Sequence, residues 1–321
     1  MSAPPESIDA DAVASGVRTS MRVLTTRCRA AQDLRLFEHQ AAKSLLLGNV
    51  RSRFRGRGME FEEARPYQPG DDIRAIDWRV SARTGKTHTK VYAEERERPV
   101  HIVLDQRNCM YFGSQARFKS VLAAELAACL AWASLGASDR IGGQIFSDTR
   151  ETDIRARRNK QAILRFLTSI IEFNHALPDA VEDQNRGTED AVNTRPLDYV
   201  FEECRRLIRP GTALFVLSDF SDFNDDAAKL LSALGRHAEI TLFWITDPLE
   251  FDLDLSGRLG VSDGRSTRSI DFSRDLRDRY RSERLDQRER LERAARRSRS
   301  RLVRVDTAVE PVSFLRKLYR S

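Results

Sequence analysis

Residues 65–83 read RPYQPGDDIRAIDWRVSAR, and a short charged stretch leads from them into HIVLD at 101–105. The first segment combines paired opposite charges, a Pro-Gly turn and a tryptophan, whereas the second is an apolar run that ends in an acid. Pro66 and Pro69 fix the backbone at two points, and the acids after Gly70 supply carboxylates to the turn. We therefore expect a polar, turn-containing segment that is followed by the first strand of a core domain.

The rest of the chain alternates strand and helix patterns. Near-continuous apolar strands are typical of a parallel sheet that is covered on both faces, and crossover helices join such strands. The pattern predicts a doubly wound, mostly parallel α/β domain over residues 99–321, with a loop at 174–193 and a hairpin around Asp263-Gly264 at 257–271. The predicted strands are 100–104, 141–146, 213–218, 240–246 and 302–305, and the predicted helices are 120–133, 162–173 and 197–208.

Two regions precede this domain. Residues 1–50 form an N-terminal arm, expected to be disordered to residue 20 and then an amphipathic helix over 23–47. Residues 51–98 form a small β-rich segment that is expected to pack on the main domain through Tyr67 and Trp78. Its role is either structural or the recognition of a partner. The other residues expected in its turn and ion-pair network are Arg65, Gly70, Asp71, Asp72, Arg74, Asp77 and Arg83.

Composition excludes several classes of protein. The chain is 40% hydrophobic and 32% charged, no apolar run reaches the length of a membrane span, and the acidic N-terminus is unlike a signal peptide, so we expect a cytoplasmic protein. The four cysteines lack the spacing of a zinc site or a disulfide framework.

Residues 274–301 hold 12 arginines and 6 acids, an excess equal to the net charge of +6. Such mixed charges indicate a solvated, ion-paired helix.

The segment at 65–83, taken with the strand at 101–105, resembles the bacterial family called domain of unknown function 58. In that family such a segment precedes a von Willebrand factor A-like domain, and the resemblance extends over about residues 45–320. It implies a von Willebrand A-like version of the predicted α/β fold.

The end of the first strand is the expected site, since ligands of open α/β sheets bind beyond the carboxyl ends of strands. The resemblance implies a metal site there, with an Asp-x-Ser-x-Ser motif and a Thr and an Asp from later loops. Asp105, Thr194 and Asp219 match it, but Arg107 and Cys109 replace the serines. A thiol is a poor magnesium ligand and a guanidinium repels a dication. We expect a metal-free site in which Arg107 pairs with Asp105 or Asp219; alternatively, Asp105 only caps a helix.

The resemblance implies a protein-interaction or adaptor role, not an enzyme, in partnership with a MoxR-type AAA+ ATPase in chaperone-like assembly and without a cofactor. The acids have no nucleophile or histidine beside them, and no phosphate-binding loop is present. The expected partner face is Asp105, Arg107, Asn108, Thr194 and Asp219, with Arg107 bonding a partner's carboxylate directly. The alternative is nucleic-acid binding through 51–57 and 296–299.

Overall fold

The computed structural model describes residues 16–37, 59–94, 98–184, 195–251, 257–262 and 267–319. The chain divides into two compact units, one made of residues 1–36 and 98–321 and the other of residues 37–97. The basic segment at 51–57 and residues 1–15 of the arm that is expected to be disordered lie outside the described ranges, whereas residues 16–20 are described. Docking of the smaller unit onto the larger one stays a prediction.

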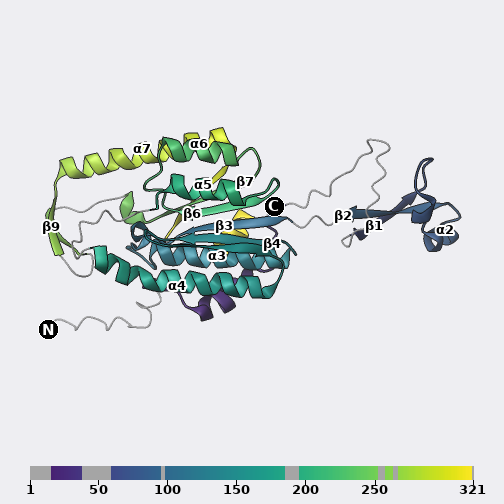
Figure 1. The fold of residues 1–321 in the computed structure, drawn as a ribbon, viewed down its shortest axis with the longest axis horizontal. Helices are drawn as coiled ribbons and strands as arrows, with labels where there is room; N and C mark the ends of the chain where they lie inside the picture. The colour runs from purple at the N-terminus through teal and green to yellow at the C-terminus, as the bar shows by residue number, and fades with distance from the viewer. Residues whose placement is uncertain are drawn as a thin grey trace, which may run out of the picture. The chain divides into compact units, whose positions relative to one another are not determined.

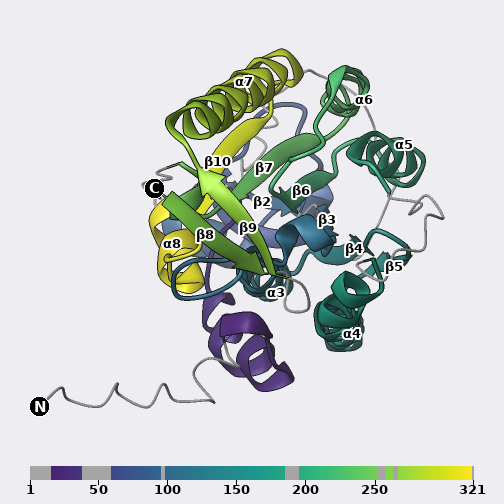
Figure 2. The same cartoon turned by 90° about the vertical axis from the view of Figure 1, so that its left-hand side faces the viewer.

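The larger unit, drawn in Figure 1, is built on a six-stranded sheet with the strand order β10-β7-β6-β3-β4-β5, which can be followed by its labels in Figure 2. All five predicted strands are confirmed and pair in parallel. The sixth strand, β5, was not predicted; it is an antiparallel edge strand, and its charged, exposed residues give no apolar run. The bounds are β3 (Pro99–Asp105), β4 (Arg140–Phe146), β5 (Glu151–Arg157), β6 (Ala213–Ser218), β7 (Glu239–Thr246) and β10 (Arg301–Asp306).

Helices cover both faces of the sheet, so the predicted doubly wound, von Willebrand A-like α/β fold is confirmed (Figures 1 and 2). Three helices lie on one face, where residues of all three join β6 and β7 in one hydrophobic core. These are α5 (Leu197–Leu207), α6 (Asp225–Leu234) and α7 (Arg274–Ser298). The opposite face carries α3 (Lys119–Gly136), α4 (Lys160–Gln184) and α8 (Pro311–Leu318).

Helix α3 is the most buried helix, as its Ala- and Leu-rich sequence predicts, with residues from Lys119 to Ser134 all buried. Among the described helices it is the one long and apolar enough to cross a membrane, and 89% of that stretch is buried inside the domain. A central helix packed on a parallel sheet is apolar all round for the same reason as a membrane helix, because every side of it meets other apolar groups.

Two predicted boundaries were wrong. The segment 174–193 was expected to be a loop, but α4 continues to Gln184. Asn174, which reads as a loop residue, is buried in the helix and donates from Nδ2 to Gln106 Oε1 at 3.0 Å. The predicted helix at 23–47 is also wrong: short helical turns end at Ala31 and the following residues to 37 are not helical, while 38–47 lie outside the described residues.

These N-terminal turns are held by tertiary contacts. Leu24, Cys28 and Ala31 are buried, and Trp132 of α3 donates from its indole nitrogen to the Leu24 carbonyl at 2.8 Å. Between β7 and α7 the chain forms a hairpin. Its strands, β8 (Gly257–Ser262) and β9 (Thr267–Phe272), confirm the hairpin predicted at 257–271.

The smaller unit pairs β1 (Met59–Pro66) with β2 (His88–Glu94) in an antiparallel ladder, and α2 (Trp78–Thr84) lies between them in the chain. The expected turn at Pro69-Gly70 is present, with Gly70 at φ 108°, a value that favours glycine. Asp71 accepts a bond from the Gln68 backbone NH at 2.9 Å and pairs with Arg65 at 2.7 Å.

The wider ion-pair network predicted in the smaller unit is not formed by the described side chains. Asp72 accepts from the Arg74 backbone NH, and Asp77 accepts from the first NH groups of α2. Both acids therefore cap helical turns, which satisfies backbone donors that have no helical partner. Arg74 and Arg83 are exposed and form no ion pair with a described residue, and the Trp78 side chain is 70% exposed.

Candidate functional site

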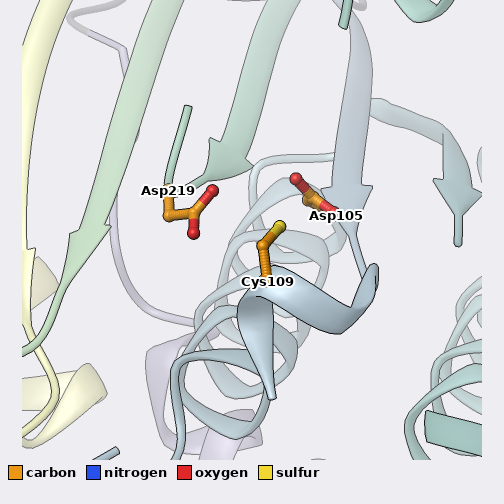
Figure 3. Close-up of side chains that lie close together, drawn as sticks. All are labelled: Asp105, Cys109 and Asp219. Carbon is orange, nitrogen blue, oxygen red and sulfur yellow. The ribbon is translucent and has the colours of Figure 1, made fainter. Parts of the chain in front are cut away.

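Two buried acids meet at the carboxyl edge, the side of the sheet where β3, β6 and β7 end. Strands β3 and β6 are parallel neighbours, so Asp105 at the end of β3 and Asp219 just after β6 come together (Figure 3). Asp105 is fully buried and Asp219 is 2% exposed. Placing two carboxylates in a low-dielectric environment is costly, so each requires a nearby cation or several hydrogen-bond donors.

Arg107 provides the cation for Asp105. Its Nε donates to one carboxylate oxygen at 3.0 Å and its Nη2 donates to the other at 2.8 Å, which is the bidentate geometry of a guanidinium on a carboxylate. The Arg107 backbone NH and the Ser218 hydroxyl also donate to Asp105, at 3.0 and 2.6 Å. Burial raises the pKa of the Asp105 carboxyl, and the guanidinium and the hydroxyl act in the opposite direction.

Arg107 has a second carboxylate partner that the sequence did not predict. Its Nη1 and Nη2 donate to the two oxygens of Asp222 at 2.6 and 3.0 Å, and its guanidinium lies 5.2 Å from the centre of the Phe146 ring. Of the two partners expected for Arg107, Asp105 is therefore found, but Asp219 is not. Arg107 is 4% exposed, so in this conformation its guanidinium is directed into the domain and is not presented to a partner's carboxylate.

Asp219 is paired instead with a lysine that sequence reasoning missed. Lys119 Nζ lies 2.7 Å from Asp219 Oδ2 and 2.8 Å from Glu250 Oε1, and the lysine is only 2% exposed. Arg284 of α7 adds a contact to Glu250 at 3.0 Å. Burial raises the pKa of Asp219, but the Lys119 ammonium and the Ser221 backbone NH bring it below its usual value. A lysine at the start of an otherwise apolar helix is the only hint of this role in the sequence.

Cys109 completes the group. The residue is half-buried and its Sγ is directed toward the space between the two carboxylates; the ligand atoms of Asp105, Cys109 and Asp219 all lie within 4.8 Å of one another (Figure 3). Burial and the two acids raise the pKa of the thiol well above its ordinary value. The sulfur is therefore a protonated thiol at neutral pH and not the thiolate that binds metals.

These residues do not fit the magnesium site of the von Willebrand A-type motif. Both oxygens of Asp105 and both oxygens of Asp219 already accept hydrogen bonds, from Arg107, Ser218, Lys119 and Ser221. Magnesium requires an octahedral set of oxygen ligands at about 2.0–2.1 Å. Binding it here would break two buried ion pairs and place a dication beside two fixed positive charges. The side chains of Arg107 and Lys119 neutralise the two carboxylates, which is the electrostatic role that a metal ion would have.

The expected result of titrating the protein with magnesium or manganese chloride is therefore no stoichiometric binding tighter than about 100 μM, which corresponds to roughly 5.5 kcal/mol. Calorimetry at low ionic strength measures it directly. A saturable one-to-one isotherm in the micromolar range, abolished by Asp105→Asn, would contradict the electrostatic account of this site.

Two further residues were expected at the site. Asn108 is half-buried beside it, and its backbone NH donates to Asp148 Oδ2 at 2.8 Å. Thr194 lies outside the described residues, so its role stays a prediction. Its neighbour Arg195 does reach the site, because the Arg195 carbonyl accepts a bond from Arg107 Nη1 at 3.3 Å.

Comparison with known proteins assigns the chain to a family. Residues 63–290 match the family model described as protein of unknown function DUF58. An uncharacterized protein of Mycobacterium bovis is 30% identical over 246 residues, which cover 77% of this chain and 73% of that protein. An uncharacterized protein of Mycobacterium tuberculosis matches with the same identity and coverage. The chain therefore belongs to the family described as protein of unknown function DUF58.

Proposed function

We propose that this protein is a non-enzymatic adaptor of the cytoplasm that binds a protein partner, a MoxR-type AAA+ ATPase, at the carboxyl edge of its sheet. The observation that carries the proposal is the complete internal pairing of the acids at that edge. Asp105 and Asp219 have no free oxygen for a substrate or a metal, and the neighbouring thiol is protonated. Such an arrangement supports a fixed, metal-independent binding surface.

The surface open to a partner consists of residues around the buried ion pairs. Phe112, which follows Asn108 and Cys109 in the same loop, is 39% exposed, and its ring centre lies 5.8 Å from the Lys119 ammonium. Ser221 is exposed and Asp222 is partly exposed on the loop after β6. Aromatic side chains with a polar surround are the usual anchors of protein interfaces. In this arrangement Arg107 and Lys119 lie beneath the surface residues and hold them in place, but they do not contact the partner.

The test is capture of the MoxR-type ATPase from the same cell by the full-length protein, with affinity measured by biolayer interferometry. We expect Phe112→Ala to weaken binding about tenfold, which is roughly 1.4 kcal/mol, because an exposed aromatic anchor is lost. Leu207→Ala is the control, since Leu207 is 43% exposed but lies at the end of α5 that is remote from this edge. An equal effect of both substitutions, or no binding by the wild type, would rule out the proposed surface.

Nucleic-acid binding through α7 receives less support. Three of its ion pairs join residues four apart: Arg288 with Glu292, Arg293 with Glu289, and Arg296 with Glu292. These acids lower the positive potential that a phosphate backbone would meet. The ion-paired helix face predicted from the sequence is confirmed, and the other basic segment, 51–57, lies outside the described residues.

A further inference from the structure

A cavity of about 180 Å³ lies between the loop after β7 and the first half of α7. The first turns of α7 extend beyond the sheet (Figure 1), whereas buried residues of the helix begin only at Leu291. This half of the helix therefore packs on little except the walls of the cavity. We call the cavity the arginine pocket, after Arg277, Arg281 and Arg284 that line it.

The arginine pocket has positive charge that no carboxylate of the described residues matches. Arg277, Arg281 and Arg284 follow a spacing of four and three residues, which places them on one face of the helix. The acid in the lining, Glu250, is already shared between Lys119 and Arg284. Arg277 and Arg281 form no ion pair with any described residue, and Arg277 Nε is buried with no hydrogen-bond acceptor among them.

The remaining walls are apolar or aromatic. Phe251 and Tyr280 line the arginine pocket together with Leu285, which is 52% exposed. A volume of this size holds about one benzene-sized group, since an engineered cavity of about 150 Å³ binds benzene. It is too small for a nucleotide or a drug-sized ligand, which occupy about 300–1,000 Å³. The occupant is therefore the size of one amino-acid side chain.

We infer that the arginine pocket receives an acidic side chain of a protein partner, with an apolar side chain beside it. Arg277 and Arg281, which have no carboxylate partner in the described part of the chain, match a carboxylate, because the planar fork of arginine binds both of its oxygens. Phe251 and Leu285 provide apolar contact for the neighbouring residue of the same peptide. The charge and the size of the pocket together select an acidic, apolar segment of protein.

The arginine pocket is joined to the acids of the candidate site by a short chain of contacts. Arg284 binds Glu250, Glu250 binds Lys119 and Lys119 binds Asp219, each at 3.0 Å or less. A partner seated at the carboxyl edge can therefore reach the pocket without spanning the domain. The assignment of the occupant to a protein rests on the proposed function, and it adds the chemistry that the partner must present.

The experiment uses two fluorescein-labelled, C-terminally amidated peptides of the composition Gly-Ser-Leu-Glu-Phe-Glu-Leu-Gly-Ser, one with Glu and one with Gln at both acidic positions. Fluorescence anisotropy with the full-length protein measures their affinity. We expect the Glu peptide to bind at least tenfold more tightly than the Gln peptide. Arg277→Ala combined with Arg281→Ala should remove that preference.

The matched control is Arg279→Ala combined with Arg290→Ala, which removes the same charge from exposed positions on another face of α7. We expect it to keep at least half of the wild-type affinity. If both double variants lost the same affinity for the Glu peptide, the effect would come from net charge alone, and the inference would be overturned. Equal binding of the Glu and Gln peptides would overturn it as well, as would displacement of the Glu peptide by inorganic phosphate at concentrations where acetate has no effect.

The two proposals fail separately. Absence of ATPase capture by the wild type, with peptide binding intact, removes the proposed partner but keeps the ligand chemistry of the arginine pocket. Capture that depends on Phe112 but not on Arg277 and Arg281, with no preference for the Glu peptide, keeps the adaptor function and removes the pocket. Circular dichroism and melting curves of the double variants confirm that folding is unchanged.

Discussion

Replacing Lys119 with Ala is expected to lower the free energy of unfolding by about 3–5 kcal/mol, the range for removing one partner of a buried ion pair. Lys119 neutralises Asp219 and Glu250 at 2.7 and 2.8 Å, and all three side chains are at most 6% exposed. Without the ammonium, Asp219 stays buried with no direct cation. Urea denaturation at pH 7 followed by far-UV circular dichroism measures the change.

The chain provides a matched control for burial. Lys229 and Asp226 form an ion pair at the same distance, 2.7 Å, but their side chains are 76% and 69% exposed. Solvent screens such a pair, so Lys229→Ala should change stability far less than Lys119→Ala does. Similar effects of the two substitutions would show that Lys119 is not held in the buried network.

The protonation of Asp219 determines how this loss in the free energy of unfolding depends on pH. The pKa of this carboxyl is lower in the folded state than its usual value, so its stabilising contribution is present above the unfolded pKa and is lost as pH falls through the folded pKa. The difference between wild type and Lys119→Ala should therefore shrink toward strongly acidic pH. A difference that stays constant down to pH 2 would contradict the ion-pair explanation.

Replacing Arg107 with Ala should have a comparable effect, about 3–5 kcal/mol, because Asp105 is fully buried and loses a bidentate partner. A direct bond from Arg107 to a partner's carboxylate, as expected from the sequence, would require its guanidinium to leave Asp105 and Asp222, since Arg107 is only 4% exposed. Phe112 is the better position for testing partner binding, because its side chain is exposed at the same edge.

Arg205→Ala serves as the comparison for Arg107. Arg205 pairs with Glu202 at 2.7 Å, but the two side chains are 56% and 30% exposed. We expect Arg205→Ala to lower stability far less than Arg107→Ala, because solvent screens this pair. The double variant Arg107→Ala with Asp105→Ala should recover part of the lost stability, as it removes the unpaired carboxylate. A stability loss in the double variant that equals or exceeds the sum of the two single losses would contradict a direct coupling of these residues.

Most of the fold was predictable because burial leaves a local signature in the chain. Strands such as β3 and β6 lie inside the domain on both faces, so their residues are apolar throughout and their positions in the chain could be read directly. Strand β5 could not, because an edge strand half-exposed to solvent carries charges and has no continuous apolar run. The end of α4 was missed for a related reason, since Asn174 is polar but is buried by a bond to Gln106.

The sequence by itself determined the α/β class, the position of Asp105 and Asp219 at the carboxyl edge and the presence of Arg107 and Cys109 close behind Asp105. Only the tertiary structure decided which cation neutralises each acid. Lys119 reaches Asp219 across 100 residues of chain, and Arg107 reaches Asp222 across 115. A charged residue in a sequence is equally compatible with exposure to solvent and with a buried ion pair. The local pattern of apolar residues indicates whether a segment is buried, but it does not indicate which distant carboxylate folding brings beside a charged side chain.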